Sequence, residues 1–145
     1  MDKSLESIID NQKNYFKSKK TLSIDFRIQK LKDLLKEIKS NEKEIELALF
    51  NDLGKSSGES YLTEIHFVYS EINIDLKGIK KWVKRKSVRS NLINFPSSDY
   101  IIPEPLGNTL HISPWNYPFQ LSIAPLIGAI AAGNTVLLKP SEYSV

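Results

Sequence analysis

Polar side chains that could do chemistry are concentrated near the end of this 145-residue chain, between Ile112 and Glu142. Asn116 lies within the run Pro-Trp-Asn-Tyr-Pro, and Lys139 and Glu142 follow a second apolar run. A carboxamide NH2 can stabilise negative charge on a carbonyl oxygen, while an ammonium and a carboxylate can bind sugar hydroxyls. Such groups, placed where a chain enters and leaves a sheet, are typical of a ligand site.

Each of these residues also has an ordinary structural interpretation. Asn is a favoured N-cap residue, and spacing alone favours that role for Asn116 before a helix that begins at Pro118. Lys139 could be a surface residue, and Glu142 could lie near a helix N-terminus, where the helix dipole favours a carboxylate. Residue types and spacing alone therefore favour structural roles.

The elements around these residues are expected to form a strand, a helix and a second parallel strand. Residues 109–112 and 135–138 are mostly apolar, and residues 118–132 between them have helical length. This order is typical of a parallel βαβ unit whose strands are covered on both faces. Ligands of such sheets bind outside the carboxyl ends of the strands, where Lys139 is expected.

Four amphipathic helices are predicted before this unit. Thr21 and Ser23 are candidate N-caps, Asn41 and Glu44 have the spacing of a capping box, and Gly54 suits a left-handed helix end. The apolar stripes predict helices over residues 5–16, 24–38, 45–53 and 62–83.

A different pattern follows the helices. Residues 88–95 and 99–105 are rich in β-branched and aromatic residues around the turn Pro96-Ser97-Ser98, which predicts an extended hairpin or arm. Pro103 and Pro105 cannot donate hydrogen bonds to a sheet, so the second segment is expected at an edge.

Composition indicates a soluble globular protein, because 41% of the residues are apolar and 26% are charged. The net charge of +3 says little about partners. No signal peptide is visible, and the most apolar window, residues 119–132, is shorter than the roughly 18 residues of a membrane helix. We expect a cytoplasmic protein.

Three other kinds of site are weak here. His66 and His111 have no partners at metal-ligand spacing, so no metal is assigned. Seven Lys and Arg residues lie within residues 77–89, but a solvated helix C-terminus explains them better than nucleic-acid binding does. The run GKSSG lacks the spacing of a phosphate-binding loop.

The chain resembles the N-terminal third of an aldehyde dehydrogenase, and more closely the class 3 branch. The similarity is collinear over almost the whole chain and strongest after Gly107. Its most specific pieces are PEPLGNTLHISPWNYPF (103–119) and PLIGAIAAGNTVLLKPSE (125–142); FRIQKLKDL (26–34), ALFNDLGKS (48–56) and EIHFVYSEI (64–72) also match.

The resemblance implies NAD(P)-dependent oxidation of aldehydes to carboxylic acids through a cysteine thiohemiacetal. The family's cysteine and catalytic glutamate are expected beyond Val145. Since these 145 residues contain no cysteine, the chain alone is predicted to be inactive. A full-length homodimer is expected.

The matched motifs assign roles to individual residues. Asn116 is expected to stabilise the oxyanion, and Tyr117 to line the aldehyde pocket. Lys139 and Glu142 are expected to bind the cofactor ribose, with a weak preference for NAD over NADP because a carboxylate repels a 2′-phosphate. Backbone contacts to the cofactor are expected from Ile112, Ser113, Pro114 and Trp115.

The expected fold is α/β, with N-terminal helices and the first βαβ unit of a Rossmann-type sheet. The expected domains are a helical part of the cofactor-binding domain (1–85), an oligomerisation arm (86–106) and the βαβ unit (107–145). The alternatives are a noncatalytic binding or assembly module and, within the enzyme interpretation, a semialdehyde dehydrogenase.

Overall fold

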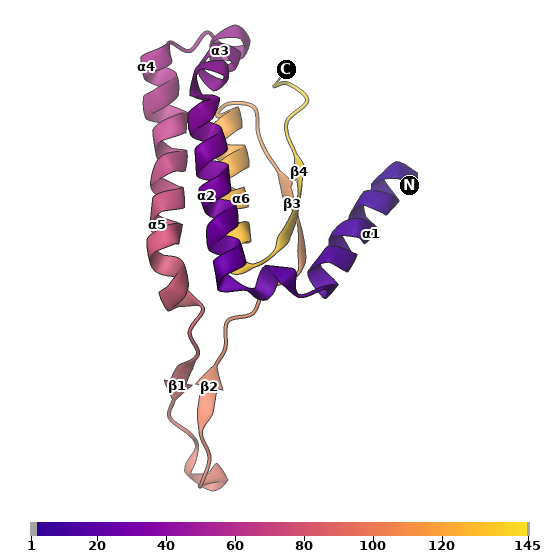
Figure 1. Ribbon diagram of the computed structural model, residues 1–145, viewed down its shortest axis with the longest axis vertical. Helices are drawn as coiled ribbons and strands as arrows, with labels where there is room; N and C mark the ends of the chain where they lie inside the picture. Colours follow the sequence, from indigo (N-terminus) through magenta and orange to yellow (C-terminus); the bar gives the residue numbers. More distant parts are fainter. Residues whose placement is uncertain (1–2, 145) are drawn as a thin grey trace.

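Residues 3–144 are described by a computed structural model, in which helices pack on a two-stranded parallel sheet (Figure 1). Helices α2, α5 and α6 lie side by side, and α6 covers one face of strands β3 and β4. Helix α1 contacts both strands from another side, and a thin two-stranded arm projects from the body. This arrangement confirms the expected α/β fold.

The core lies between these helices because their apolar stripes face one another. Its fully or nearly fully buried members come from α2, α5 and α6: Leu31, Ile38, Val68, Ile72, Ile79, Ile127 and Ala131. Burial of a branched aliphatic side chain contributes about 1.5–3 kcal/mol, so this cluster orients the helix that leads into the candidate site.

The first half of the chain is helical, as predicted. It contains α1 (Lys3–Lys17), the 3-10 turn η1 (Lys20–Leu22), α2 (Ile24–Ser40) and α3 (Glu42–Leu53). Ser23 caps α2 by accepting a hydrogen bond from the Phe26 amide, at 3.3 Å. Gly54 ends α3 in the left-handed conformation with φ 68°.

Two predicted caps are wrong. Asn41 precedes α3, but its carboxamide donates backward to the Glu37 carbonyl at 2.8 Å and caps nothing in α3. The end of α2 and the start of α3 are nearly continuous, and the Glu37 carbonyl that takes this donor also accepts the Asn41 backbone amide, at 3.1 Å. Thr21 is buried inside η1, and its hydroxyl has no partner within residues 3–144.

The next helical stretch begins earlier than predicted and contains a wide turn. It comprises α4 (Ser57–Ser60), the π-helical segment η2 (Tyr61–Ile65) and α5 (His66–Trp82). Ser56 caps α4 by accepting from the Glu59 amide, at 3.2 Å. Single π-helical turns are rare overall, but many of those that occur lie at functional sites.

The arm is a short antiparallel hairpin of β1 (Lys86–Val88) and β2 (Asp99–Ile101), with the turn η3 (Leu92–Asn94) near its tip. The hairpin is confirmed, but β1 lies before most of the predicted segment. Residues 92–95 turn back toward β2 instead of extending, and Phe95–Pro96 is a cis peptide bond.

The chain ends in the predicted βαβ unit: β3 (Asn108–Ile112), α6 (Pro118–Ala132) and β4 (Thr135–Lys139), with parallel strands. Pro118 occupies the first turn of α6, where a missing amide costs nothing. Gly133 ends α6 with φ 91° and packs closely on Arg27; an added Cβ would lie 2.5 Å from the guanidinium carbon.

Candidate active site at the carboxyl ends of the strands

The parallel strands bring two groups of predicted residues to one end of the sheet. Ile112 pairs with Lys139 in the sheet register, and the Ser113 amide donates to the Lys139 carbonyl at 3.1 Å. The loop of residues 113–117 between β3 and α6 therefore begins beside the segment that follows β4. This is the edge at which open α/β sheets bind ligands.

The loop is anchored at its start and open at its centre. Ser113 is buried, and its hydroxyl donates to the Leu121 carbonyl at 3.4 Å. Pro114, Trp115 and Asn116 are exposed, as is the Ile112 side chain at the end of β3. The structure therefore presents these residues to solvent instead of packing them in the core.

Asn116 is not the cap of α6. Helix α6 begins after Tyr117, and neither Tyr117 nor Asn116 caps it with a side chain. The Asn116 carboxamide has no hydrogen-bond partner among residues 3–144, although its backbone carbonyl accepts from Lys55. The side chain is therefore free to donate to a ligand, and the structural interpretation offered by spacing fails.

Glu64, which sequence reasoning missed, takes the capping role. Its Oε2 accepts from the Phe119 amide at 2.9 Å and from the Gln120 amide at 3.1 Å. These are the first free amides of α6, since Pro118 has none. A carboxylate at a helix N-terminus is favoured by the helix dipole as well as by the hydrogen bonds.

Lys55, also missed, completes this buried cluster. Its ammonium forms a short ion pair with Glu64 Oε1 and donates to the Asn116 carbonyl at 3.3 Å. It also lies 4.2 Å from the centre of the Tyr117 ring, in a cation–π contact. Side-chain exposure is 9% for Lys55 and 0% for Glu64.

No local pattern identifies these two residues as a pair. Lys55 follows the predicted end of α3, and Glu64 is separated by more than fifty residues from the amides that it caps. Both do lie within segments that carry the family resemblance, 48–56 and 64–72. That was the one available signal.

Lys139 and Glu142 form a second ion pair, with the ammonium 2.5 Å from Glu142 Oε2. Both side chains are more than half exposed. The hydrogen bond from Lys139 holds the pKa of Glu142 below its ordinary value of 4.5, together with a backbone hydrogen bond. The carboxylate is therefore charged at neutral pH and available as an acceptor.

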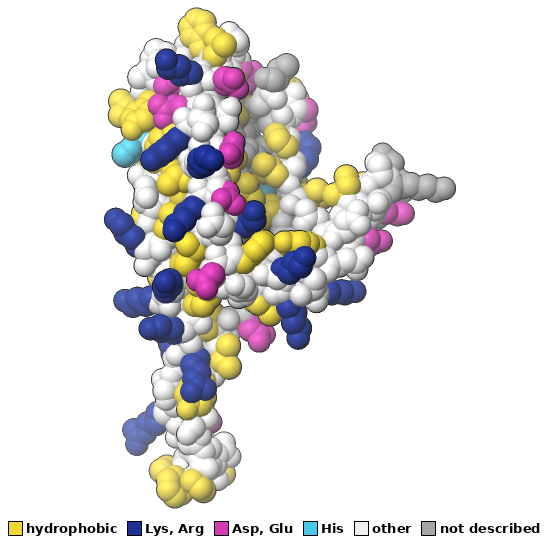
Figure 2. Space-filling view, in the orientation of Figure 1, with side chains coloured by type: hydrophobic (Ala, Val, Ile, Leu, Met, Phe, Trp, Pro, Cys, Tyr) yellow, Lys and Arg dark blue, Asp and Glu magenta, His cyan; other side chains and the backbone are white. Residues whose placement is uncertain are grey.

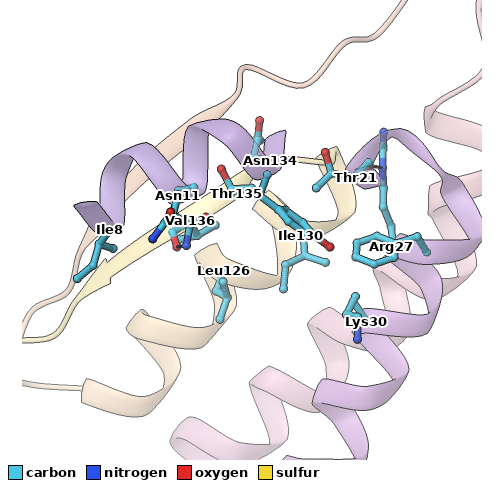
Figure 3. A pocket seen from close by; sticks show the side chains of 13 residues that line it. Ile8, Asn11, Thr21, Arg27, Lys30, Leu126, Ile130, Asn134, Thr135 and Val136 are labelled. Carbon is cyan, nitrogen blue, oxygen red and sulfur yellow. Dashed lines mark hydrogen bonds between the residues drawn. The ribbon is translucent and has the colours of Figure 1, made fainter. Parts of the chain in front are cut away.

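A cavity of the described chain lies away from this site. It has a volume of about 570 Å³ and lies between α1, α2, α6 and the amino end of β4, where Thr135 and Val136 line it (Figure 3). Its lining is mainly apolar. Because β4 runs away from this cavity toward Lys139, the cavity and the candidate site lie at opposite ends of the strand.

Residues 3–144 contain no group of three His, Asp or Glu side chains that could hold a metal ion. Among the same residues, no helix is long and apolar enough to cross a membrane.

Comparison with known proteins identifies the family of this chain. The sequence profile of the aldehyde dehydrogenase family matches residues 2–145. The chain belongs to this family. Members use NAD(P) to oxidise aldehydes, and several relatives are named family 3 aldehyde dehydrogenases, which confirms the class 3 resemblance.

Individual relatives show how much of the family's length is present. The chain is 49% identical over 140 residues to 4,4'-diaponeurosporen-aldehyde dehydrogenase of Staphylococcus aureus, covering 97% of this chain and 30% of that protein. It is 42% identical over 141 residues to a rat aldehyde dehydrogenase described as dimeric and NADP-preferring, covering 97% and 31%.

A solved structure confirms the fold. Staphylococcus aureus AldH in a substrate-bound state superposes with a TM-score of 0.92 at 48% identity, covering 95% of this chain and 30% of that one. The chain therefore spans about 30% of the length of these relatives.

Proposed function

We propose that the whole protein oxidises aldehydes to carboxylic acids with NAD(P) and water, through a thiohemiacetal on a cysteine. The 145 residues contain no cysteine, so the nucleophile must come from the remainder of the protein. This chain contributes the oxyanion donor and part of the cofactor site. Bound NAD(P) supplies the hydride acceptor.

The observation that carries this proposal is the free carboxamide of Asn116. Its side chain is exposed and unpaired within residues 3–144, while its backbone carbonyl is bound by a buried lysine. When a thiolate attacks an aldehyde, charge develops on the carbonyl oxygen, and an NH2 donor directed at that oxygen stabilises the charge. Tyr117, next along the chain, is proposed to line the aldehyde pocket.

The residues at the end of β4 fit a nucleotide ribose. The Glu142 carboxylate can accept from two sugar hydroxyls, and the Lys139 ammonium can donate to one. Ile112, Ser113, Pro114 and Trp115 lie on the neighbouring strand and loop, where they can contact a cofactor. Lys139 and Glu142 can bind either cofactor. Because a carboxylate repels the 2′-phosphate of NADP, Glu142 favours NAD.

Replacement of Asn116 tests the proposal in the full-length protein. Aldehyde-dependent formation of NADH or NADPH should be seen with the unaltered protein, and Asn116→Ala should reduce kcat about 100- to 1000-fold. Cofactor affinity should stay within about twofold, because the carboxamide acts on the aldehyde oxygen. An unaltered protein without activity, or a fully active Asn116→Ala variant, would refute the assignment.

The arm favours a second role, in assembly. Leu92, Ile93 and Phe95 at its tip are each more than 80% exposed (yellow at the lower end of Figure 2). Apolar side chains gathered at the end of a projecting hairpin are typical of a protein interface. We propose that residues 86–106 pair two copies; ultracentrifugation should show a dimer that Phe95→Asp converts to monomer.

A further inference from the structure

The ammonium of Lys55 has three protons and three partners. The partners are the Glu64 carboxylate, the Asn116 carbonyl at 3.3 Å and the Tyr117 ring face at 4.2 Å. Two of these partners belong to the loop that carries the oxyanion donor. A nearly buried lysine is costly unless its hydrogen-bonding capacity is met, and here Glu64 and the loop meet it together.

The Glu64 carboxylate is fully used in the same way. One oxygen binds Lys55, and the other accepts both free amides at the start of α6. Glu64 is 0% exposed and lies in the π-helical segment η2, whose wider turn is an uncommon backbone geometry. The pair therefore connects three separate parts of the chain: residue 55, η2 and the loop before α6.

This cluster binds the backbone around Asn116 and leaves its side chain free. Lys55 binds the Asn116 carbonyl and contacts the Tyr117 ring. Glu64 accepts hydrogen bonds from the two amides that follow Pro118. No side-chain partner within residues 3–144 competes for the Asn116 carboxamide. A donor whose backbone is immobilised loses little entropy when it binds a transient charge.

We propose that Lys55, held by Glu64, is a positioning residue that sets the location of the Asn116 carboxamide for oxyanion stabilisation. The catalytic part of this inference rests on the proposed function; the anchoring of residues 113–117 does not. Lys55 touches neither substrate nor cofactor, and it acts through Asn116.

The double variant K55M/E64Q is the central test, made in the full-length protein. Lys55→Met alone would leave a buried carboxylate unpaired and could prevent folding. The double variant removes both charges, and the Gln carbonyl oxygen can still accept the amides of α6. The matched control is K13M/D10N, which removes an exposed ion pair on α1.

We expect K55M/E64Q to bind NAD(P) within about twofold of the unaltered protein and to lose about 10- to 100-fold in kcat, the cost of a small misplacement. In an Asn116→Ala background, the same double substitution should cost less than about twofold. If Lys55 and Glu64 had a structural role independent of Asn116, K55M/E64Q would reduce kcat by the same factor in both backgrounds. The K13M/D10N control should keep full activity.

Hydrogen exchange of the Phe119 and Gln120 amides, which donate to Glu64, provides a readout independent of catalysis. Their exchange should be at least about tenfold faster in K55M/E64Q and unchanged in the control. Unaltered exchange, unaltered kcat or equal losses with and without Asn116 would overturn the inference. An inactive parent protein would refute the proposed function and the catalytic part, and exchange would then decide the anchoring alone.

Discussion

Two lysine–glutamate pairs lie in the candidate site, and they differ in almost every physical respect. Lys55 and Glu64 are at most 9% exposed, nine residues apart, and bound to backbone groups of a distant loop and helix. Lys139 and Glu142 are three residues apart, exposed, and bound mainly to each other. The first pair is held by tertiary structure and the second by local geometry.

This difference indicates that the buried pair supports the backbone, whereas the exposed pair can bind a ligand. A buried pair cannot meet a ligand, but it can hold the backbone of a residue that does. An exposed pair contributes little to stability because water competes for both charges. The same exposure leaves its carboxylate open to sugar hydroxyls. One pair therefore fits a structural support, and the other fits a binding site.

Breaking the buried pair should have the largest effect on stability. Lys55→Met leaves the Glu64 carboxylate buried without its cation, and such changes cost about 3–5 kcal/mol in the free energy of unfolding. Urea denaturation checks this value. K55M/E64Q should recover much of the loss, and exposed Lys13→Met should change little. A Lys55→Met loss below about 1 kcal/mol would remove the contrast between the pairs.

Breaking the exposed pair should affect ligand binding and leave stability unchanged. Glu142→Ala removes the proposed ribose acceptor, so the Kd for NAD(P) in the full-length protein should rise about tenfold, the value of one charged hydrogen bond. Fluorescence titration measures the Kd, and urea denaturation should give an unaltered midpoint. Glu6→Ala, on exposed α1, is the control; equal Kd values for both variants would contradict the ribose assignment.

The cap of α2 provides a local counterpart to the distant cap of α6. Ser23→Ala removes the hydroxyl that accepts from the Phe26 amide, and the free energy of unfolding should fall by about 1 kcal/mol. Thermal or urea unfolding checks this, with Ser98→Ala in the exposed arm as control. A loss as large as that of Lys55→Met would mean that local and tertiary capping do not differ here.

The smallest expected effect is on the pKa of Glu142. Lys139 lowers the pKa of Glu142, so any stabilisation from the pair is present above the ordinary glutamate pKa and is lost as pH falls through the lowered value. Lys139→Met should return the Glu142 pKa toward 4.5. Carbon-13 NMR titration of the carboxylate measures this change, and an unshifted pKa in Lys139→Met would contradict the pairing in solution.

Sequence reasoning succeeded where the relevant interactions are local. The strand, helix and strand of the βαβ unit, the Ser23 cap and the Gly54 helix end follow from apolar periodicity and from backbone preferences of single residues. It failed at Asn41, whose side chain donates to a carbonyl of the preceding helix instead of capping α3. It placed β1 too late because a polar strand of three residues has no distinct pattern.

The sequence by itself determined the order of elements, the position of Asn116 and of the Lys139–Glu142 pair at strand ends, and the family resemblance. Only the tertiary structure decided that Asn116 is free of a capping role, because a glutamate from a remote π-helical turn occupies the amides that it could have capped. Hydrogen-bond competition between residues far apart in the chain has no local pattern, so folding must bring the competitors together before the outcome is set.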